Sequence, residues 1–157
     1  MKIYTLKREM WIQDSIKNVF SFFQQPENLA KITPPSLGFQ ILTPQPIVMK
    51  EGALITYTVG VLGFRIGWKT LITAYDPPYS FVDEQIQGPY LLWHHRHDFE
   101  EVDGGVRMLD TVNYAIAFGL FGEVARKLYV TSQLEMIFDY RQKVITQIFN
   151  TSGENLA

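Results

Sequence analysis

The chain has 157 residues, which suits one domain able to bury about two-thirds of the surface that its unfolded form exposes. Its 14 Lys and Arg nearly balance its 16 Asp and Glu. The chain has no run of basic residues that could neutralise phosphates, so nucleic acid is not an expected partner. The lack of Cys excludes disulfides and thiolate zinc sites and fits a reducing compartment. The N-terminus lacks the apolar core of a signal peptide, and the longest apolar stretches are shorter than the roughly 20 residues of a membrane-spanning helix, so we expect a cytoplasmic protein.

The N-terminal part of the chain predicts a strand and two short helices. Alternating residues over 3–11 indicate the strand. Asp14 then stands where a helix N-cap is expected, and apolar residues at helical spacing follow until Pro26. A second short helix is expected over 27–32, before the Thr33-Pro34-Pro35 segment.

From Gly38 onward, apolar alternation and regularly spaced turn signals predict six more strands. They cover residues 39–42, 53–61, 65–75, 80–87, 91–101 and 106–116. Short connections make consecutive strands antiparallel neighbours, which gives a meander.

The last predicted element is a long helix over 123–149, whose apolar residues recur at helical spacing without Pro or Gly. It can bury its apolar stripe by lying across the concave face of a curved sheet. We therefore predict an α+β helix-grip fold: a seven-stranded curved antiparallel sheet, two short helices after the first strand, and the long helix over the concave face with an apolar cavity beneath it. A closed eight-stranded barrel is the alternative. The domain is expected over 1–150, with a C-terminal tail over 151–157.

Apolar loops gather at one end of the predicted sheet, because successive turns of a meander alternate between its two ends. These loops are 61–64, 87–90 and 117–122, and none of them contains a charged residue. Their large apolar side chains belong to Leu62, Phe64, Tyr90, Phe118, Leu120 and Phe121. Two interpretations stay open. One is a mobile lid over a cavity mouth, hinged at Gly63, Gly119 and Gly122 and able to contact a membrane or a protein transiently; the other is a hydrophobic plug.

Polar residues are expected on the concave face of the strand over 91–101. Trp93 and Phe99 identify the inward face, and strand alternation then brings His95 and His97 inside. A two-residue turn at Asp103-Gly104 predicts four cross-strand pairs: Phe99 with Met108, His97 with Asp110, His95 with Val112, and Trp93 with Tyr114. A longer turn at Gly104-Gly105 is the alternative and would change the partner of His97. Alternation also turns Trp68 inward.

The expected pair of His97 and Asp110 has three interpretations: a hydrogen-bonded structural pair, a polar anchor for an apolar ligand, or an oriented general base. No nucleophile can be placed beside it, so both residues are only candidates for catalysis. We expect no metal and no cofactor, because two His on one strand face converge poorly and match no zinc spacing. Whether Asp83 or Glu84 points inward stays open, since a buried carboxylate would need a partner.

Several of these residues also form a pattern. Its central motif consists of residues 81–85, Gly88-Pro89, Trp93, His95, His97 and Phe99, and it continues through 110–114, Gly119, Gly122, Phe138 and Arg141. In this the chain resembles bacterial proteins of the START-like or Bet v 1-like superfamily (SRPBCC), the polyketide cyclase/dehydrase-like ligand-binding proteins. The resemblance implies a helix-grip domain holding a hydrophobic molecule. It also implies relatives that are lipid carriers, ubiquinone-binding proteins, aromatic cyclases and plant hormone binders.

We therefore expect a protein that binds or carries a small hydrophobic molecule, lipid-like, quinone or aromatic, and we favour binding over catalysis. The alternatives are a polyketide cyclase or dehydratase using His97 and Asp110, and an interaction module docking through its apolar loop end. The predicted ligand-binding residues are Phe64, Trp68, Tyr90, Trp93, His95, His97, Asp110, Tyr114, Phe118 and Phe121.

Overall fold

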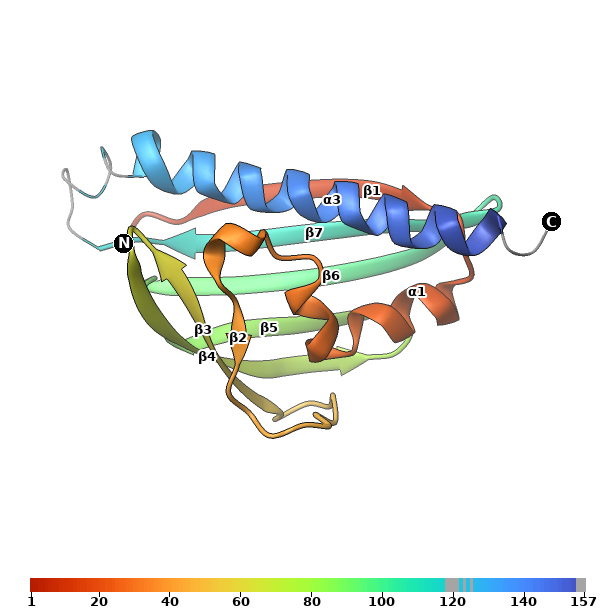
Figure 1. The fold of residues 1–157 in the computed structure, drawn as a ribbon, viewed down its shortest axis with the longest axis horizontal. Coiled ribbons are helices and arrows are strands. Elements are labelled where there is room, and N and C mark those ends of the chain that lie inside the picture. Colours follow the sequence, from red (N-terminus) through yellow and green to blue (C-terminus); the bar gives the residue numbers. More distant parts are fainter. Residues whose placement is uncertain (118–121, 123, 125, 155–157) are drawn as a thin grey trace.

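The computed structural model describes residues 1–117, 122, 124 and 126–154, and its elements follow the predicted order (Figure 1). The N-terminal elements are β1 (Tyr4–Ile12), α1 (Ile16–Phe23) and the 3-10 turns η1 (Pro26–Ala30) and η2 (Pro35–Leu37). The remaining strands are β2 (Gln40–Ile41), β3 (Leu54–Val61), β4 (Phe64–Asp76), β5 (Ser80–Gln87), β6 (Leu92–Val102) and β7 (Gly105–Ala115). A π-helical turn, η3 (Arg126–Val130), leads into the long helix α3 (Thr131–Glu154).

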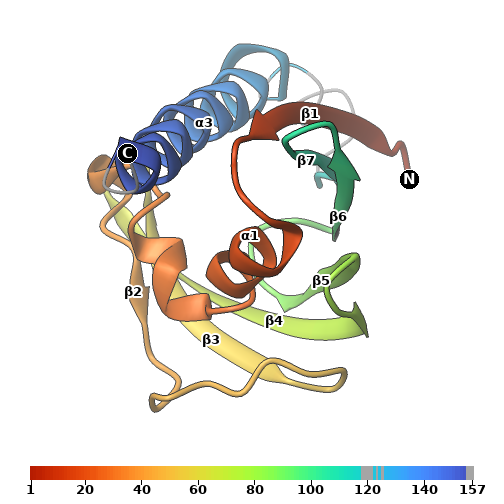
Figure 2. The same cartoon turned by 90° about the vertical axis from the view of Figure 1, so that its right-hand side faces the viewer.

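All the strands form one seven-stranded sheet in the order β1-β7-β6-β5-β4-β3-β2, and every pair is antiparallel. The sheet curls so that β1 and β2 are its two free edges, with α1 inside the curve and α3 across the gap between those edges (Figure 2). A sheet with free edges covered by a helix is the predicted helix-grip fold and differs from a closed barrel.

The β6–β7 hairpin has the predicted register. Its Cα partners are Phe99 with Met108, His97 with Asp110, His95 with Val112, and Trp93 with Tyr114. The tight turn places Gly104 at a φ of 74°, in the left-handed region that glycine adopts without strain. The pairing of His97 with Asp110 therefore follows from turn chemistry and strand alternation alone.

Several helix boundaries differ from the prediction. The helix expected over 27–32 is the 3-10 turn η1, and the long helix expected from 123 becomes α-helical only at Thr131, after the π-helical turn η3. The N-cap of α1 is Ser15, whose hydroxyl accepts a hydrogen bond from the Asn18 backbone N–H at 3.2 Å. Asp14 instead accepts from the Ser15 backbone N–H at 2.7 Å and from the Asn18 side chain at 2.8 Å, so it supports the cap from one residue outside. Helix α3 extends beyond the predicted end at Phe149, to Glu154.

The core fills one end of the space between the sheet and α3. Residues of α1, including Phe20 and Phe23, pack there with Phe99 and Met108 of the sheet and with Ile145 of α3. Phe20 meets Phe99 edge-on at 5.4 Å, a favourable aromatic geometry. No helix in the described ranges is long and apolar enough to cross a bilayer.

Candidate functional site

An internal cavity of about 180 Å³ lies between α3, the 3-10 turns and the concave faces of β3 to β6. Most of its lining side chains are aromatic or aliphatic. An apolar cavity of about 150 Å³ can hold a benzene molecule. The size therefore suits one aromatic ring with a short substituent, or a short acyl chain.

One wall of the cavity is a connected group of aromatic rings. Tyr57 stacks on Trp68 with ring centroids 5.8 Å apart and 16° between planes, and Trp68 meets Trp93 edge-on at 5.3 Å. Tyr90 closes the group at 5.5 Å from Trp68 and 4.8 Å from Trp93. Such rings present flat apolar surfaces with little conformational freedom, which suits them to hold a planar ligand.

Tyr90 is positioned by Gln85 on the inward side of β5. The Gln85 side-chain amide donates to the Tyr90 carbonyl at 2.7 Å, and its oxygen accepts from the Tyr90 backbone N–H at 3.2 Å. The connection between β5 and β6 is thus clamped from inside the sheet.

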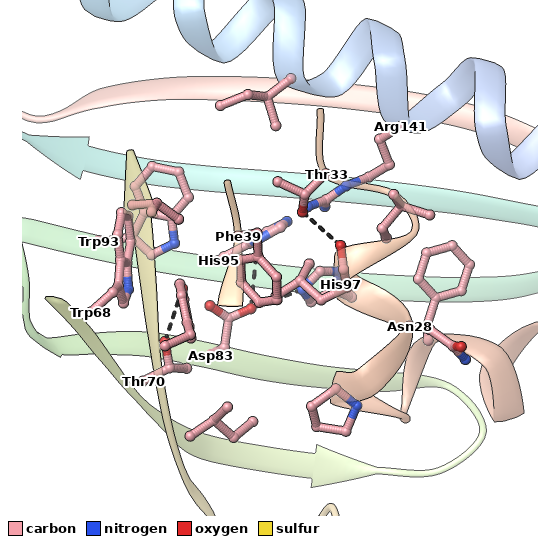
Figure 3. A pocket seen from close by; sticks show the side chains of 18 of the residues that line it. Asn28, Thr33, Phe39, Trp68, Thr70, Asp83, Trp93, His95, His97 and Arg141 are labelled. Carbon is pink, nitrogen blue, oxygen red and sulfur yellow. Dashed lines mark hydrogen bonds and ion pairs between the residues drawn. The ribbon is translucent and has the colours of Figure 1, made fainter. Parts of the chain in front are cut away.

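Four ionisable residues, here called the His-Asp quartet, form a closed ring of contacts beside the aromatic wall; three are buried and Asp83 is partly buried. Figure 3 shows three of them, Asp83, His95 and His97. They are Asp83 of β5, His95 and His97 of β6, and Asp110 of β7. His97 Nε2 donates to Asp83 Oδ2 at 2.9 Å, and His95 Nε2 donates to Asp110 Oδ1 at 2.9 Å. The remaining ring nitrogens complete the circuit: His97 Nδ1 lies 2.7 Å from Asp110 Oδ1, and His95 Nδ1 lies 3.5 Å from Asp83 Oδ2.

The contacts shift the pKa values of the His-Asp quartet in different directions. Burial opposes charge on all four, but the neighbouring imidazoles outweigh it and lower the pKa of Asp83 and of Asp110. For His97 burial is outweighed by Asp110 and Asp83, which raise its pKa, whereas burial and the neighbouring His97 lower the pKa of His95. The shifts favour ionised carboxylates and make His97 the more readily protonated of the two histidines. The longest contact of the quartet is the 3.5 Å between His95 Nδ1 and Asp83 Oδ2.

Arg141 lies on the other side of the cavity. It comes from α3, its side chain points toward the pocket in Figure 3, and only 8% of it is exposed. Its guanidinium lies over the Phe138 ring, 4.8 Å from the centroid. Arg141 Nε is buried without a hydrogen-bond partner, and no carboxylate of the described residues lies at ion-pair distance from the side chain.

The predicted site residues fall into three groups. Five of them line the cavity: Trp68, Tyr90, Trp93, His95 and His97. Asp110 lies behind the two histidines, and Tyr114 is buried in a separate cluster with Tyr4 and Val112, so neither belongs to the cavity wall. Phe64 is 74% exposed and does not line the cavity. Phe118 and Phe121 lie outside the described residues.

The apolar loop over 61–64 differs from the predicted lid. Val61 pairs with Phe64, so Leu62 and Gly63 form a two-residue hairpin turn with φ values of 51° and 80°. Positive φ at both positions is typical of a type I′ turn, which makes Gly63 part of a tight turn and not a hinge. Leu62 is 71% exposed and thus covers nothing. Gly119 lies outside the described residues.

Two site residues could not be assigned from sequence alone. Asp83 turns inward because its β5 position pairs with Ile72 on β4 and with His95 on β6, both of them buried. A register shift between Ile72 and Ala74 interrupts the β4–β5 ladder, and turn signals do not predict such a bulge. Arg141 had a visible signal, because it follows Phe138 by three residues and Leu134 by seven on the apolar stripe of the helix.

Asp83, His95 and His97 are close enough to hold a cation, since one ligand atom from each lies within 4.8 Å of the others. They converge better than strand spacing predicts. However, every ring nitrogen of both histidines already faces a carboxylate oxygen, and Arg141 adds a positive charge to the same cavity. A cation here would have to displace the protons of these contacts and would lie near the Arg141 charge.

No protein-family model matches the sequence, and no curated protein is similar to it at a significant level. The structure, by contrast, is similar to solved structures. The Zhui aromatase/cyclase from Streptomyces sp. R1128 superposes with a TM-score of 0.74 at 15% identity, over 95% of this chain and 94% of that chain. The di-domain aromatase/cyclase StfQ of the steffimycin biosynthetic pathway gives a TM-score of 0.74 at 11% identity, over 97% of this chain and 52% of that chain.

A plant protein has the same arrangement. Major latex-like protein 151 from Panax ginseng gives a TM-score of 0.68 at 12% identity, over 94% of this chain and 97% of that chain. At such low identities the likeness concerns the fold. Together with the sheet order and the covering helix, it shows that this chain has a helix-grip fold, which it shares with these aromatase/cyclases and with the major latex-like protein.

Proposed function

We propose that the protein binds or carries a small hydrophobic molecule, with an aromatic, quinone or short lipid-like body, in the cavity between α3 and the sheet. The observation that carries the proposal is the cavity itself: about 180 Å³, partly open to solvent and lined by a stacked aromatic wall and aliphatic side chains. Natural interiors are close-packed, so an unfilled apolar space of this size is unusual. A ligand that fills it would bury apolar surface, which favours binding.

A filled cavity should abolish this binding. Ile137 of α3 lines the cavity, whereas its neighbour Met136 does not and is 38% exposed. Ile137→Phe therefore places a ring in the ligand space, while the matched control Met136→Phe adds the same ring outside it. We expect the wild type and the control to bind a hydrophobic panel, measured by calorimetry and by native mass spectrometry. Ile137→Phe should lose at least tenfold in affinity.

The outcomes separate clearly. Equal affinity of the wild type and Ile137→Phe would show that the ligands bind elsewhere. If no panel member binds the wild type and no hydrophobic compound co-purifies with it, the proposal fails.

A second function, cyclase or dehydratase chemistry, is favoured by one observation. His97 and Asp83 both line the cavity, and Asp110 contacts the other nitrogen of the His97 ring, so a substrate that displaces the Asp83 contact would meet an oriented acid–base group. The similar structures named aromatase/cyclase support the same idea at the level of fold. Turnover of an aromatic polyketide precursor should then disappear in His97→Gln while the variant still binds the compound. Binding without turnover by the wild type would leave only the carrier function.

A further inference from the structure

The cavity contains buried hydrogen-bond donors that no acceptor serves. Among the described lining residues, Arg141 Nε, Trp68 Nε1 and His97 Nδ1 are buried without a hydrogen-bond partner, although His97 Nδ1 lies 2.7 Å from Asp110 Oδ1. Two of the lining oxygens are engaged elsewhere: Asp83 Oδ2 accepts from His97, and Thr70 Oγ1 lies 3.4 Å from the Tyr57 hydroxyl. A ligand that brings acceptors would therefore satisfy Arg141 Nε and Trp68 Nε1.

Arg141 is the stronger of the two unpaired donors. A guanidinium has five N–H groups and stays charged in proteins, so burying it without partners is costly. The Arg141 charge lowers the pKa of Asp83 from a distance, but no quartet oxygen lies within ion-pair reach of the guanidinium. Arg141 Nε is thus left without a hydrogen-bond partner. In an unliganded cavity only water could serve it.

We propose that Arg141 is the anchor for a carboxylate head group, and that the ligand is a small hydrophobic acid whose apolar body lies against the wall of Tyr57, Trp68 and Trp93. A carboxylate offers two oxygens in the geometry of the guanidinium fork, which a single carbonyl cannot match. This inference rests on the proposed binding function and narrows it to a substrate class. In this proposal Arg141 is the charged anchor of the ligand, a role that neither a lid nor the His-Asp quartet can fill.

The test compares acids with their uncharged amides of equal shape. The full chain is titrated by calorimetry with benzoate, cinnamate, 2-naphthoate and octanoate, and with the four corresponding amides. We expect the best-binding acid to bind at least tenfold more tightly than its amide. Arg141→Met should reduce the affinity of that acid at least tenfold and that of the amide less than threefold. The control Lys143→Met removes one exposed charge from the same helix and should change neither affinity.

A purely structural Arg141 would behave differently. Met replaces an unpaired buried charge by an apolar chain of similar length, so we expect Arg141→Met to keep or raise Tm. A lowered Tm together with an unchanged preference for the acid would overturn the proposal. If Arg141→Met does not fold, Arg141→Lys keeps the charge without the fork and should reduce the acid preference severalfold.

The same titrations distinguish failure of the carboxylate anchor from failure of the proposed binding function. Amides that bind as tightly as their acids would refute the carboxylate anchor and leave the hydrophobic binder intact. The absence of binding by all eight probes would refute both.

Discussion

The most informative perturbation is Asp110→Asn, because Asp110 contacts both histidines of the quartet. The change keeps the side-chain shape but removes the negative charge that lies 2.7 Å from His97 Nδ1 and 2.9 Å from His95 Nε2. Asp110 is 4% exposed, so no water can replace the lost carboxylate. Breaking a buried ion pair on one side costs about 3–5 kcal/mol, which for a chain of this length lowers Tm by roughly 6–20 °C.

The loss of stability should depend on pH. The pKa of His97 is raised in the folded state above its ordinary value of about 6.5, so the stability it contributes is fully present below pH ~6.5. That contribution is lost as pH rises through the raised pKa, because the folded protein then gives up a proton that the unfolded chain has already lost. The free energy of unfolding should therefore differ between wild type and Asp110→Asn by more at pH 6 than at pH 9.

The assay is urea unfolding followed by tryptophan fluorescence at both pH values. Asp98→Asn is the matched control, because Asp98 lies on the same hairpin but pairs with Arg96 on the outer face with a side chain 35% exposed. An exposed pair of this kind contributes about 0–1 kcal/mol. A cost of Asp110→Asn below 1 kcal/mol at pH 6, or an equal cost at both pH values, would refute the ion pairing of His97 with Asp110.

Three further predictions concern the same sheet. In an NMR titration His97 should gain its proton above pH ~6.5 and His95 below it, since their pKa values are shifted in opposite directions. The reverse order would contradict the directions of these shifts. Gly105→Ala should destabilise the protein by more than about 1 kcal/mol in thermal unfolding, because a Cβ there would meet the Ile12 carbonyl oxygen. Gly67→Ala is the control and should cost less than about 0.5 kcal/mol, because the space around its added methyl is open. Equal effects of the two changes would contradict this packing. Zinc added in excess, or removed with a chelator, should leave Tm unchanged, and a rise of several degrees with zinc would show that the quartet binds metal.

The sequence by itself determined the order of elements, the hairpin register and the inward face of β6. These features depend on local rules: strand side chains alternate with period two, and the Gly104 turn sets which residues face each other. Alternation along one strand was therefore enough to place Trp93, His95 and His97 on the concave face. The same local rules predicted the apolar face of α3.

Tertiary structure alone decided which groups meet in the cavity. Asp83 joined the quartet because the β4–β5 bulge and the β5–β6 ladder turn it inward, and these are contacts between strands. Asp110 was predicted to contact the ligand but lies behind the histidines. Strand alternation tells which face of the sheet a side chain is on, but it does not tell whether neighbouring side chains cover it. The isolation of Arg141 depends on the packing of α3 over the sheet. The partners of a buried charge such as Arg141 come from residues distant in sequence, so the local sequence pattern cannot predict whether they are present.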